Sequence, residues 1–150
     1  MKRILITGMS GTGKSSLLQA LSKRGYKTVD TDYGYTLQEP DGGWVWREEA
    51  IQTLLSTEDA EVLFLSGTVS NQGKFYPQFD RVILLSVPKE IMLERLKTRS
   101  TNSFGKSAKE LGQILADLEA IEPLLRHGAD YEIDTNKPLE QVVDEVLQLL

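Results

Sequence analysis

Cysteine is absent from the 150 residues of the sequence, which excludes disulfide bonds and thiolate metal sites. An excess of positive charge is also missing: the formal net charge is −5, whereas nucleic acids and anionic membranes attract basic chains. No apolar run approaches the length of a membrane span, and no apolar stretch of the signal-peptide type stands at the start. We therefore expect a cytoplasmic protein without a nucleic-acid partner and without membrane association.

The composition is that of a folded domain, with 40% apolar and 26% charged residues in a chain long enough to bury one core. Apolar runs typical of buried parallel strands, with two shorter segments, predict five strands: 2–7, 26–30, 61–67, 81–87 and 131–134. Helical spacing and boundary residues predict five helices: one ending at Gly25, one over 47–55, and three beginning at Pro88, Ser107 and Pro138. The segment 33–44 holds three glycines and a proline and is predicted to be a long loop.

The alternation of strands and helices predicts the architecture. No break in composition divides the chain, so residues 1–150 are expected to form a single domain. Strands that alternate with helices pair in parallel through right-handed crossovers. The expected fold class is therefore α/β, with a five-stranded parallel sheet and helices on both of its faces.

The stretch GMSGTGKSS, residues 8–16, connects the first predicted strand to the first predicted helix. It fits G-x-x-x-x-G-K-[ST], a loop whose backbone N–H groups point at phosphates while its lysine reaches the β- and γ-phosphates and its serine hydroxyl binds Mg²⁺. The alternative interpretation is a glycine- and serine-rich turn with a solvated lysine. The strand–loop–helix context favours a nucleoside triphosphate site. Its predicted residues are Gly8, Ser10, Gly11, Thr12, Gly13, Lys14, Ser15 and Ser16.

Two aspartates follow the second predicted strand in the sequence VDTD. Asp30 and Asp32 stand at the carboxyl edge of the sheet, where open α/β folds bind ligands, and alternate residues of an extended chain share one side. One carboxylate can hold a water molecule of the Mg²⁺ shell while the other contacts a substrate hydroxyl. The alternative is a turn in which both carboxylates bond the backbone. The nearby phosphate loop favours the functional interpretation.

Arg95 and Arg99 are four residues apart in RLKTR, so they share one face of a predicted helix. The polar stretch that follows, about residues 99–107, contains a glycine and is predicted to be a lid. One arginine can stack on an adenine base while the other contacts phosphates, because a guanidinium group suits both tasks. The alternative is a solvated basic helix end that the helix dipole favours.

The chain resembles the small P-loop kinases of the shikimate kinase, gluconate kinase and nucleoside monophosphate kinase superfamily. The resemblance covers nearly the whole chain and depends on GMSGTGKSS, VDTD, WRE, the strand end LSG, RLKTR and the closing YEIDTNKPLEQVVDEVL. It implies a single-domain P-loop NTPase fold with a short lid, ATP and Mg²⁺ as cofactors, and a small-molecule acceptor bound about residues 32–58. We expect the protein to be a monomer or a weak dimer.

The resemblance also implies individual roles around the metal and the acceptor. Ser15 and Asp30 are placed near Mg²⁺, and the carboxylate of Asp32 is placed on the acceptor hydroxyl. The family's aromatic–arginine pair matches Trp46 and Arg47, which makes Arg47 a candidate for binding an anionic acceptor group. The implied acceptor contacts are Asp32, Trp46, Arg47 and Gly67.

For the nucleotide, the resemblance implies that Arg95 and Arg99 stack on adenine and contact the transition state. The loop after the last strand lies beside the base in this group, which points to Thr135, Asn136 and Pro138. The catalytic residues are thus expected to be Lys14, Asp32 and Arg99.

The family's acceptor signatures are missing, so the acceptor stays unidentified. Where shikimate kinases carry three glycines after the third strand, this chain has only Gly67, and Ile121 replaces their arginine for the shikimate carboxylate. The Asp-Gly-Phe-Pro-Arg stretch of nucleoside monophosphate kinases is also absent. The polar and aromatic segment 70–79 is a further candidate for lining the acceptor site, with Lys74 as an anion contact.

The function expected from these residues is transfer of the γ-phosphoryl group of ATP to a hydroxyl or phosphate of a small metabolite or nucleotide. The alternative is a nucleotide-binding switch or an NTPase without an acceptor substrate. TNKP, after the last predicted strand, resembles the start of an Asn-Lys-x-Asp guanine motif, but Leu139 occupies the aspartate position. A motor ATPase is disfavoured because VLFLSG ends without an acidic pair.

Overall fold

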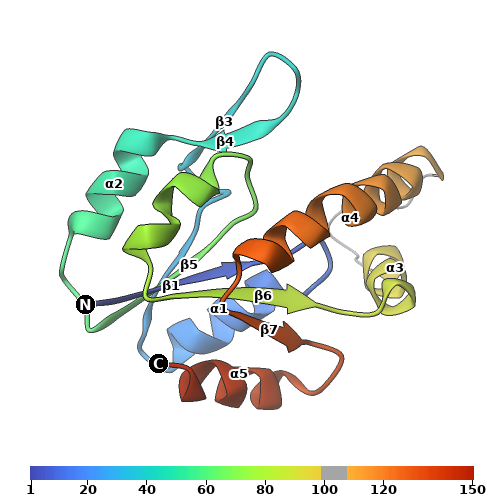
Figure 1. Ribbon diagram of the computed structural model, residues 1–150. Helices are drawn as coiled ribbons and strands as arrows, with labels where there is room; N and C mark the ends of the chain where they lie inside the picture. Colours follow the sequence, from blue (N-terminus) through green and yellow to red (C-terminus); the bar gives the residue numbers. More distant parts are fainter. Residues whose placement is uncertain (99–107) are drawn as a thin grey trace.

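Five parallel strands form the centre of the computed structural model, which describes residues 1–98 and 108–150 (Figure 1). The strands are β1 (Lys2–Thr7), β2 (Lys27–Asp30), β5 (Val62–Ser66), β6 (Arg81–Ser86) and β7 (Tyr131–Asp134). Their order across the sheet is β2-β5-β1-β6-β7, and each neighbouring pair is parallel. The predicted five-stranded parallel sheet is confirmed.

Five α-helices and one 3₁₀ helix surround this sheet in the described part of the chain. They are α1 (Lys14–Lys23), α2 (Glu48–Ser56), η1 (Gln72–Gln78), α3 (Lys89–Thr98), α4 (Ala108–Gly128) and α5 (Leu139–Gln148). The predicted lid at 99–107 lies outside the described residues. This segment includes Arg99 and the predicted capping residue Ser107. No helix within 1–98 or 108–150 combines the length and the apolar character needed to cross a membrane.

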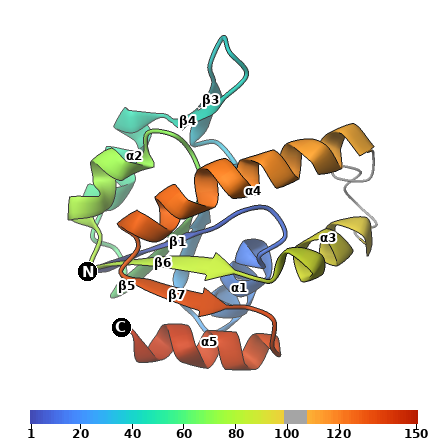
Figure 2. The ribbon, with the colours of Figure 1, turned by 45° about the vertical axis from the view of Figure 1, so that its right-hand side comes forward.

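Alternate residues of the strands build two separate cores, one on each face of the sheet. Ile4 and Ile6 of β1 pack with α1 and α5, whereas Leu5 between them packs with α2 and η1. A third apolar cluster lies between β6, α3 and α4 and includes the fully buried Met92. Figures 1 and 2 show α5 and α4 on opposite sides of the sheet. Continuous apolar runs were thus required in the central strands, because both faces are covered.

The predicted long loop at 33–44 is wrong, because this segment contains most of a β-hairpin that projects from the body (Figure 1). Strand β3 (Thr36–Gln38) pairs in antiparallel fashion with β4 (Trp44–Trp46). The turn between them is closed by backbone bonds from Glu39 N–H to Gly43 O at 2.7 Å and from Gly42 N–H to Glu39 O at 2.9 Å. Strands of three residues are too short to show an alternating pattern. The prediction of a loop was therefore based on the glycines and the proline of this segment.

Trp46 anchors the base of this hairpin in the core. Its side chain is only 1% exposed, and its ring meets that of Phe75 edge to face, with centroids 5.8 Å apart. The indole N–H donates to Thr31 Oγ1 at 2.8 Å, and the Thr31 hydroxyl donates to Ser66 O at 2.7 Å. Trp46 therefore ties the hairpin to the ends of β2 and β5.

Replacing Trp46 by phenylalanine removes the indole donor and leaves a smaller ring in a close-packed core. We expect Trp46→Phe to lower the free energy of unfolding by about 1–3 kcal/mol, measured by urea denaturation. Trp44 on the same strand is 52% exposed, so Trp44→Phe is the matched control and should change stability by less than about 0.5 kcal/mol. Equal effects of the two substitutions would contradict the anchoring role.

Candidate active site

The GMSGTGKSS loop lies at the carboxyl edge of the sheet, between the end of β1 and the start of α1. Strand β1 is central: the connection that leaves it runs past β5 to β2, whereas the connection that leaves the neighbouring β5 runs in the opposite direction, past β1 to β6. Open α/β sheets bind ligands at this switch point. The topology therefore places the loop where the sheet leaves room for a ligand.

Gly8 holds the loop close to β6 in a conformation that other residues rarely adopt. Its φ angle is +152°, and an added Cβ would lie 2.6 Å from Leu85 O and 2.8 Å from Thr12 Oγ1. The Thr12 hydroxyl in turn donates to Met9 O at 2.7 Å. Because both nearest atoms are fixed by the fold, a side chain at Gly8 would force the loop away from β6.

The N-terminus of α1 is open toward solvent and carries no acidic residue in its first turn. Its N-cap is Gly13, whose φ of 96° is left-handed and which has no side chain to bond the first N–H groups. Ser15 and Ser16 of this turn are exposed. The backbone N–H groups of this turn and the positive end of the helix dipole therefore face an anion-binding position. The ammonium group of Lys14 lies over the same loop, where it donates to Gly8 O and, at 3.2 Å, to Met9 O.

A hollow of about 350 Å³ adjoins this helix terminus and is suited to a nucleoside. Arg95 of α3 closes one side: its guanidinium donates to Gly11 O at 3.2 Å and to Thr135 O at 2.7 Å. The Thr135 hydroxyl donates to Thr12 O at 2.6 Å, which joins the end of β7 to the loop. The structure thus brings together Arg95, Thr135 and the glycine loop. The lining residues are Gly11, Gly13, Ser16, Arg95, Thr135, Lys137, Leu139 and Val142.

The other two residues expected beside the base do not line this hollow. Asn136 turns back, its N–H donating to Asp134 Oδ1 at 2.8 Å, and Pro138 is the N-cap of α5. Lys137 and Leu139 line it instead. The resemblance pointed to this loop but could not tell which of its residues line the hollow, because irregular backbone has no fixed period.

Asp30 and Asp32 lie at the end of β2, with the N–H of Asp32 donating to Asp30 Oδ1 at 3.1 Å. Desolvation raises the pKa of Asp32, the Asp30 carboxylate raises it further, and the Lys14 ammonium lowers it. The Asp32 carboxylate is therefore close enough to both Asp30 and Lys14 to be affected by their charges. Residues 1–98 and 108–150 contain no group of three or more acidic, His or Cys residues that would hold a metal by itself. A Mg²⁺ ion there would need phosphate and water ligands besides Ser15 and Asp30.

Gly67, expected to contact the acceptor, directly follows β5 and lies against the buried Thr31–Trp46 pair. An added Cβ would collide with Thr31 Oγ1 and would lie 3.1 Å from Trp46 Nε1. Glycine is therefore required here by packing. Trp46, expected in the acceptor site, points into the core behind Gly67 and presents almost no surface to a ligand.

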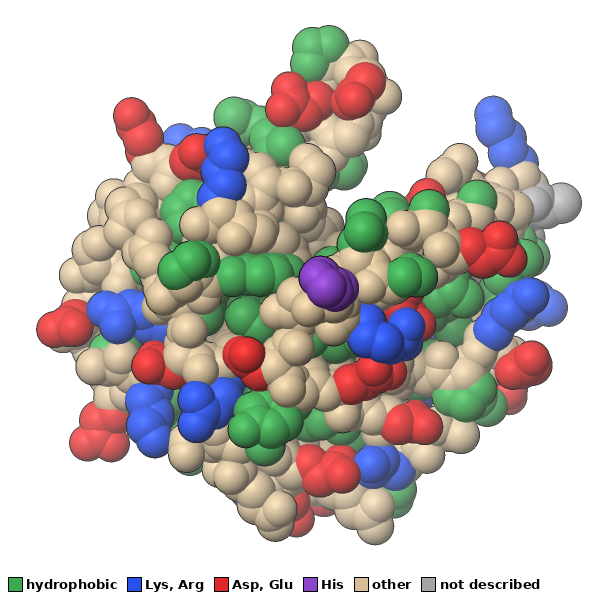
Figure 3. All heavy atoms as spheres, viewed as in Figure 1, with side chains coloured by type: hydrophobic (Ala, Val, Ile, Leu, Met, Phe, Trp, Pro, Cys, Tyr) green, Lys and Arg blue, Asp and Glu red, His purple; other side chains and the backbone are tan. Residues whose placement is uncertain are grey.

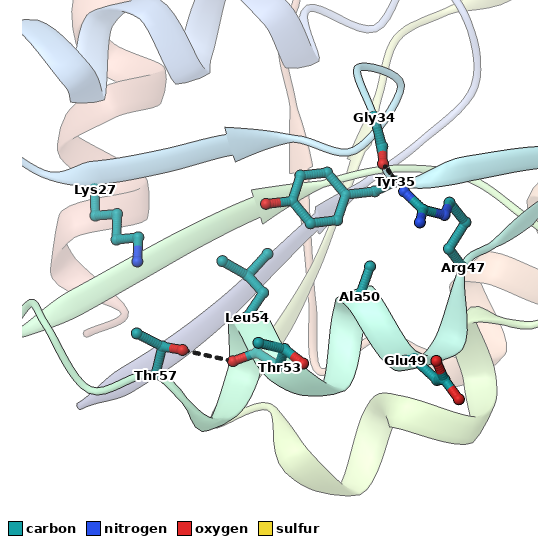
Figure 4. A pocket seen from close by; sticks show the side chains of 9 residues that line it. All are labelled: Lys27, Gly34, Tyr35, Arg47, Glu49, Ala50, Thr53, Leu54 and Thr57. Carbon is teal, nitrogen blue, oxygen red and sulfur yellow. Dashed lines mark hydrogen bonds between the residues drawn. The ribbon is translucent and has the colours of Figure 1, made fainter.

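Arg47 points away from the core and donates to Gly34 O at 2.9 Å. It lines a shallow groove of about 670 Å³ between the open edge of β2 and α2 (Figure 4). The groove extends to Lys27, the first residue of β2, at the opposite end of that strand from the glycine loop. The remaining lining residues are Tyr35, Glu49, Ala50, Thr53, Leu54 and Thr57.

The segment 70–79 contains η1 and is hydrogen-bonded to the base of the hairpin. The side chain of Asn71 accepts from Trp46 N–H at 2.8 Å and donates to Trp46 O at 3.1 Å. Lys74, expected to contact an anion, forms an ion pair with Glu48 at 3.1 Å. Thr68 and Gln72 bond to the glycine loop and to the strand before it, and sequence reasoning missed both. One signal in the sequence could have indicated these two residues: polar residues follow the apolar strand β5.

The molecular surface is hollowed between the β3–β4 hairpin and α4, and acidic and basic side chains are interspersed over this face (Figure 3). On α4, Arg126 is bonded to Glu132 at 2.7 Å and to Glu122 at 2.9 Å. Its guanidinium is thus already engaged by carboxylates.

Comparison with known proteins identifies the family. A family model described as an AAA domain matches residues 4–116. A putative adenylate kinase of Archaeoglobus fulgidus is 30% identical over 149 residues, which cover 95% of this chain and 79% of that protein. Shikimate kinase 2 of Yersinia enterocolitica is 27% identical over 166 residues, which cover 98% and 94% of the two chains.

A solved structure gives the same result for the fold. Shikimate kinase from Acinetobacter baumannii in complex with shikimate superposes with a TM-score of 0.73 at 22% identity, covering 99% of this chain and 92% of that chain. The predicted single-domain P-loop kinase fold and the predicted superfamily are confirmed. The chain belongs to the AAA-domain family of P-loop NTPases, as a kinase-like member related to the shikimate and adenylate kinases.

Proposed function

We propose that this protein is an ATP-dependent kinase that transfers the γ-phosphoryl group of ATP to a hydroxyl or phosphate group of a small acceptor. The observation that carries the proposal is the open N-terminus of α1 beside the hollow closed by Arg95 and Thr135. A helix terminus alone binds many anions, but the adjoining hollow has the size and mixed lining of a nucleoside site. The kinase relatives support the same reaction class.

The glycine loop and Lys14 would hold the triphosphate, with the base in the hollow beside Arg95. Ser15 stands in the exposed first turn of α1, where its hydroxyl would bind Mg²⁺, and Asp30 would hold a water molecule of the metal shell. When bound, Mg²⁺ supplies charge neutralisation at the β- and γ-phosphates. Positioning and electrostatic stabilisation are the main contributions that a protein makes to phosphoryl transfer.

Asp32 would orient the acceptor and accept its proton. The pKa of Asp32 is raised by desolvation and by the Asp30 carboxylate, which makes this carboxylate a stronger base than an ordinary aspartate. Asp32 lies two residues after the end of β2, at the same carboxyl edge of the sheet as the glycine loop. In the proposed reaction, Arg99 would contact the transition state, and the segment 99–107 would exclude water from the site.

An ADP-release screen over nucleoside monophosphates, sugar acids and small hydroxylated metabolites tests the proposal. We expect one acceptor class to raise ADP formation well above the acceptor-free rate. Shikimate should be a poor acceptor, because Ile121 offers no bidentate partner for a carboxylate and Arg126 is occupied by two glutamates. Nucleotide hydrolysis that no acceptor stimulates would favour the NTPase alternative, and preference for GTP over ATP would favour a switch.

Loss of the Lys14 ammonium should weaken ATP binding and abolish transfer while the fold survives. The group contacts loop carbonyls and supports no apolar core. We expect Lys14→Ala to raise the dissociation constant of ATP by at least about tenfold, measured by calorimetry, since charge-assisted bonds to phosphate are strong. Lys23→Ala, at the exposed far end of α1, is the control and should bind ATP as the unmodified protein does. Unimpaired turnover of Lys14→Ala would overturn the assignment.

The two aspartates should respond differently to substitution by asparagine. Asp30→Asn should raise the Mg²⁺ concentration needed for activity, because it removes the carboxylate assigned to the metal's water shell. Asp32→Asn should leave Mg²⁺ and ATP affinity nearly unchanged and lower acceptor turnover by roughly a hundredfold, as expected for a positioned base. Steady-state rates and Mg²⁺ titrations of both variants measure this, and the reverse pattern would exchange the two roles.

The pH profile gives a second test of Asp32. The rate should fall as pH decreases through the pKa of this base, and the raised pKa places that fall above the range of an ordinary aspartate. Asp30→Asn removes one charge that raises the pKa, so the acidic limb of kcat/KM should move to lower pH. If the acidic limb of kcat/KM lies at the same pH in Asp30→Asn and in the unmodified protein at saturating Mg²⁺, Asp32 is excluded as the titrating group.

A further inference from the structure

The side chain of Thr68, which follows β5, forms two hydrogen bonds with Gly8, the first glycine of the phosphate loop. Its hydroxyl donates to Gly8 O at 2.6 Å and accepts from Gly8 N–H at 3.3 Å. Both polar groups of a buried glycine are thereby bonded to one side chain that is 60 residues away in the sequence. The orientation of the Gly8 carbonyl therefore depends on Thr68.

The hydroxyl of Thr68 is itself oriented by a buried chain of hydrogen bonds. Because its single proton goes to Gly8 O, its 3.2 Å contact with Thr7 Oγ1 requires Thr7 to donate. Thr7 Oγ1 in turn accepts from Gln72 Nε2 at 3.1 Å. The amide of Gln72, which is 3% exposed, is fixed by Val69 N–H, which donates to its Oε1 at 2.9 Å. The chain runs in one direction, from Gln72 through Thr7 and Thr68 to Gly8 O.

Gly8 O accepts from a second donor, the ammonium group of Lys14. If the proposed function holds, on which this inference rests, Lys14 must move from this carbonyl to the phosphates when ATP binds. A buried carbonyl left without a donor is unfavourable, so that move is opposed unless another donor remains. Thr68 is that donor.

We propose that Thr68, oriented by Gln72, is a positioning residue that satisfies Gly8 O and so allows Lys14 to transfer to the triphosphate. The two residues act on the nucleotide through Lys14 and need no contact with it. The arrangement links the phosphate loop to η1, whose neighbour Asn71 bonds the backbone of Trp46 at the base of the hairpin.

Thr68→Val keeps the shape of the side chain and removes both its donor and its acceptor. We expect this variant to weaken ATP binding about tenfold, because Gly8 O then depends on Lys14. Thr68→Ser should restore the affinity to within about twofold, since it keeps the hydroxyl. Gln72→Met should weaken binding about threefold, and Gln148→Met, at the exposed end of α5, should have no effect. Nuclear magnetic resonance titration reaches the weak affinities of these variants.

A double-mutant cycle with Lys14→Ala separates positioning from mere structural damage. If Thr68 acts through Lys14, Thr68→Val should change ATP affinity less than twofold in the Lys14→Ala background. The same tenfold loss in both backgrounds would mean that Thr68 simply shapes the loop, and it would overturn the inference. Should circular dichroism show that Thr68→Val is unfolded, Gln72→Met in the same cycle decides the question by its threefold effect.

The outcome for the unmodified protein distinguishes this inference from the proposed function. ATP binding by the unmodified protein together with unchanged affinity of Thr68→Val would overturn the inference alone. Absence of ATP binding by the unmodified protein would overturn the proposed function and this inference with it.

Discussion

The exposed first turn of α1, whose backbone N–H groups are not capped by a side chain of the N-cap residue, is the constraint on which the rest of the site depends. These N–H groups stay available because Gly13, the N-cap, has no side chain and because Gly8 lets the loop lie against β6. A side chain at Gly8 would collide with Leu85 O, so the loop path is set by the sheet as well as by the motif. The fold thus presents a fixed positive terminus to an anion without an acidic residue in the first turn to compensate it.

Three separate connections hold the surroundings of this terminus in place. Arg95 and Thr135 join α3 and the end of β7 to the loop on the nucleoside side. Thr68 joins the end of β5 to Gly8. Trp46 joins the hairpin to Thr31, next to the two aspartates. Each connection ends on a backbone carbonyl or a buried hydroxyl, so the loop is positioned by directional bonds rather than by apolar packing alone.

The sheet, the glycine loop and its helix were predictable because each has a strong local signal: continuous apolar runs, or four fixed residues at fixed spacing. The hairpin at 36–46 was not, since three-residue strands carry no readable period and its apolar Leu37 and Trp44 are largely exposed. Trp46 was expected in the acceptor site, and only its burial in the folded chain shows that it faces the core. The roles of Thr68 and Gln72 come from hydrogen bonds to Gly8 and Thr7, which are 60 and 65 residues away in the sequence. No local pattern indicates contacts at such separations.

A crystal structure with Mg²⁺ and a non-hydrolysable ATP analogue tests the central claim most directly. The account predicts that the triphosphate lies on the backbone N–H groups of residues 8–16, with the base beside Arg95. Lys14 Nζ should then contact phosphate, while Thr68 Oγ1 still donates to Gly8 O. A nucleotide bound elsewhere, such as the groove between β2 and α2, with Lys14 still on Gly8 O, would contradict it.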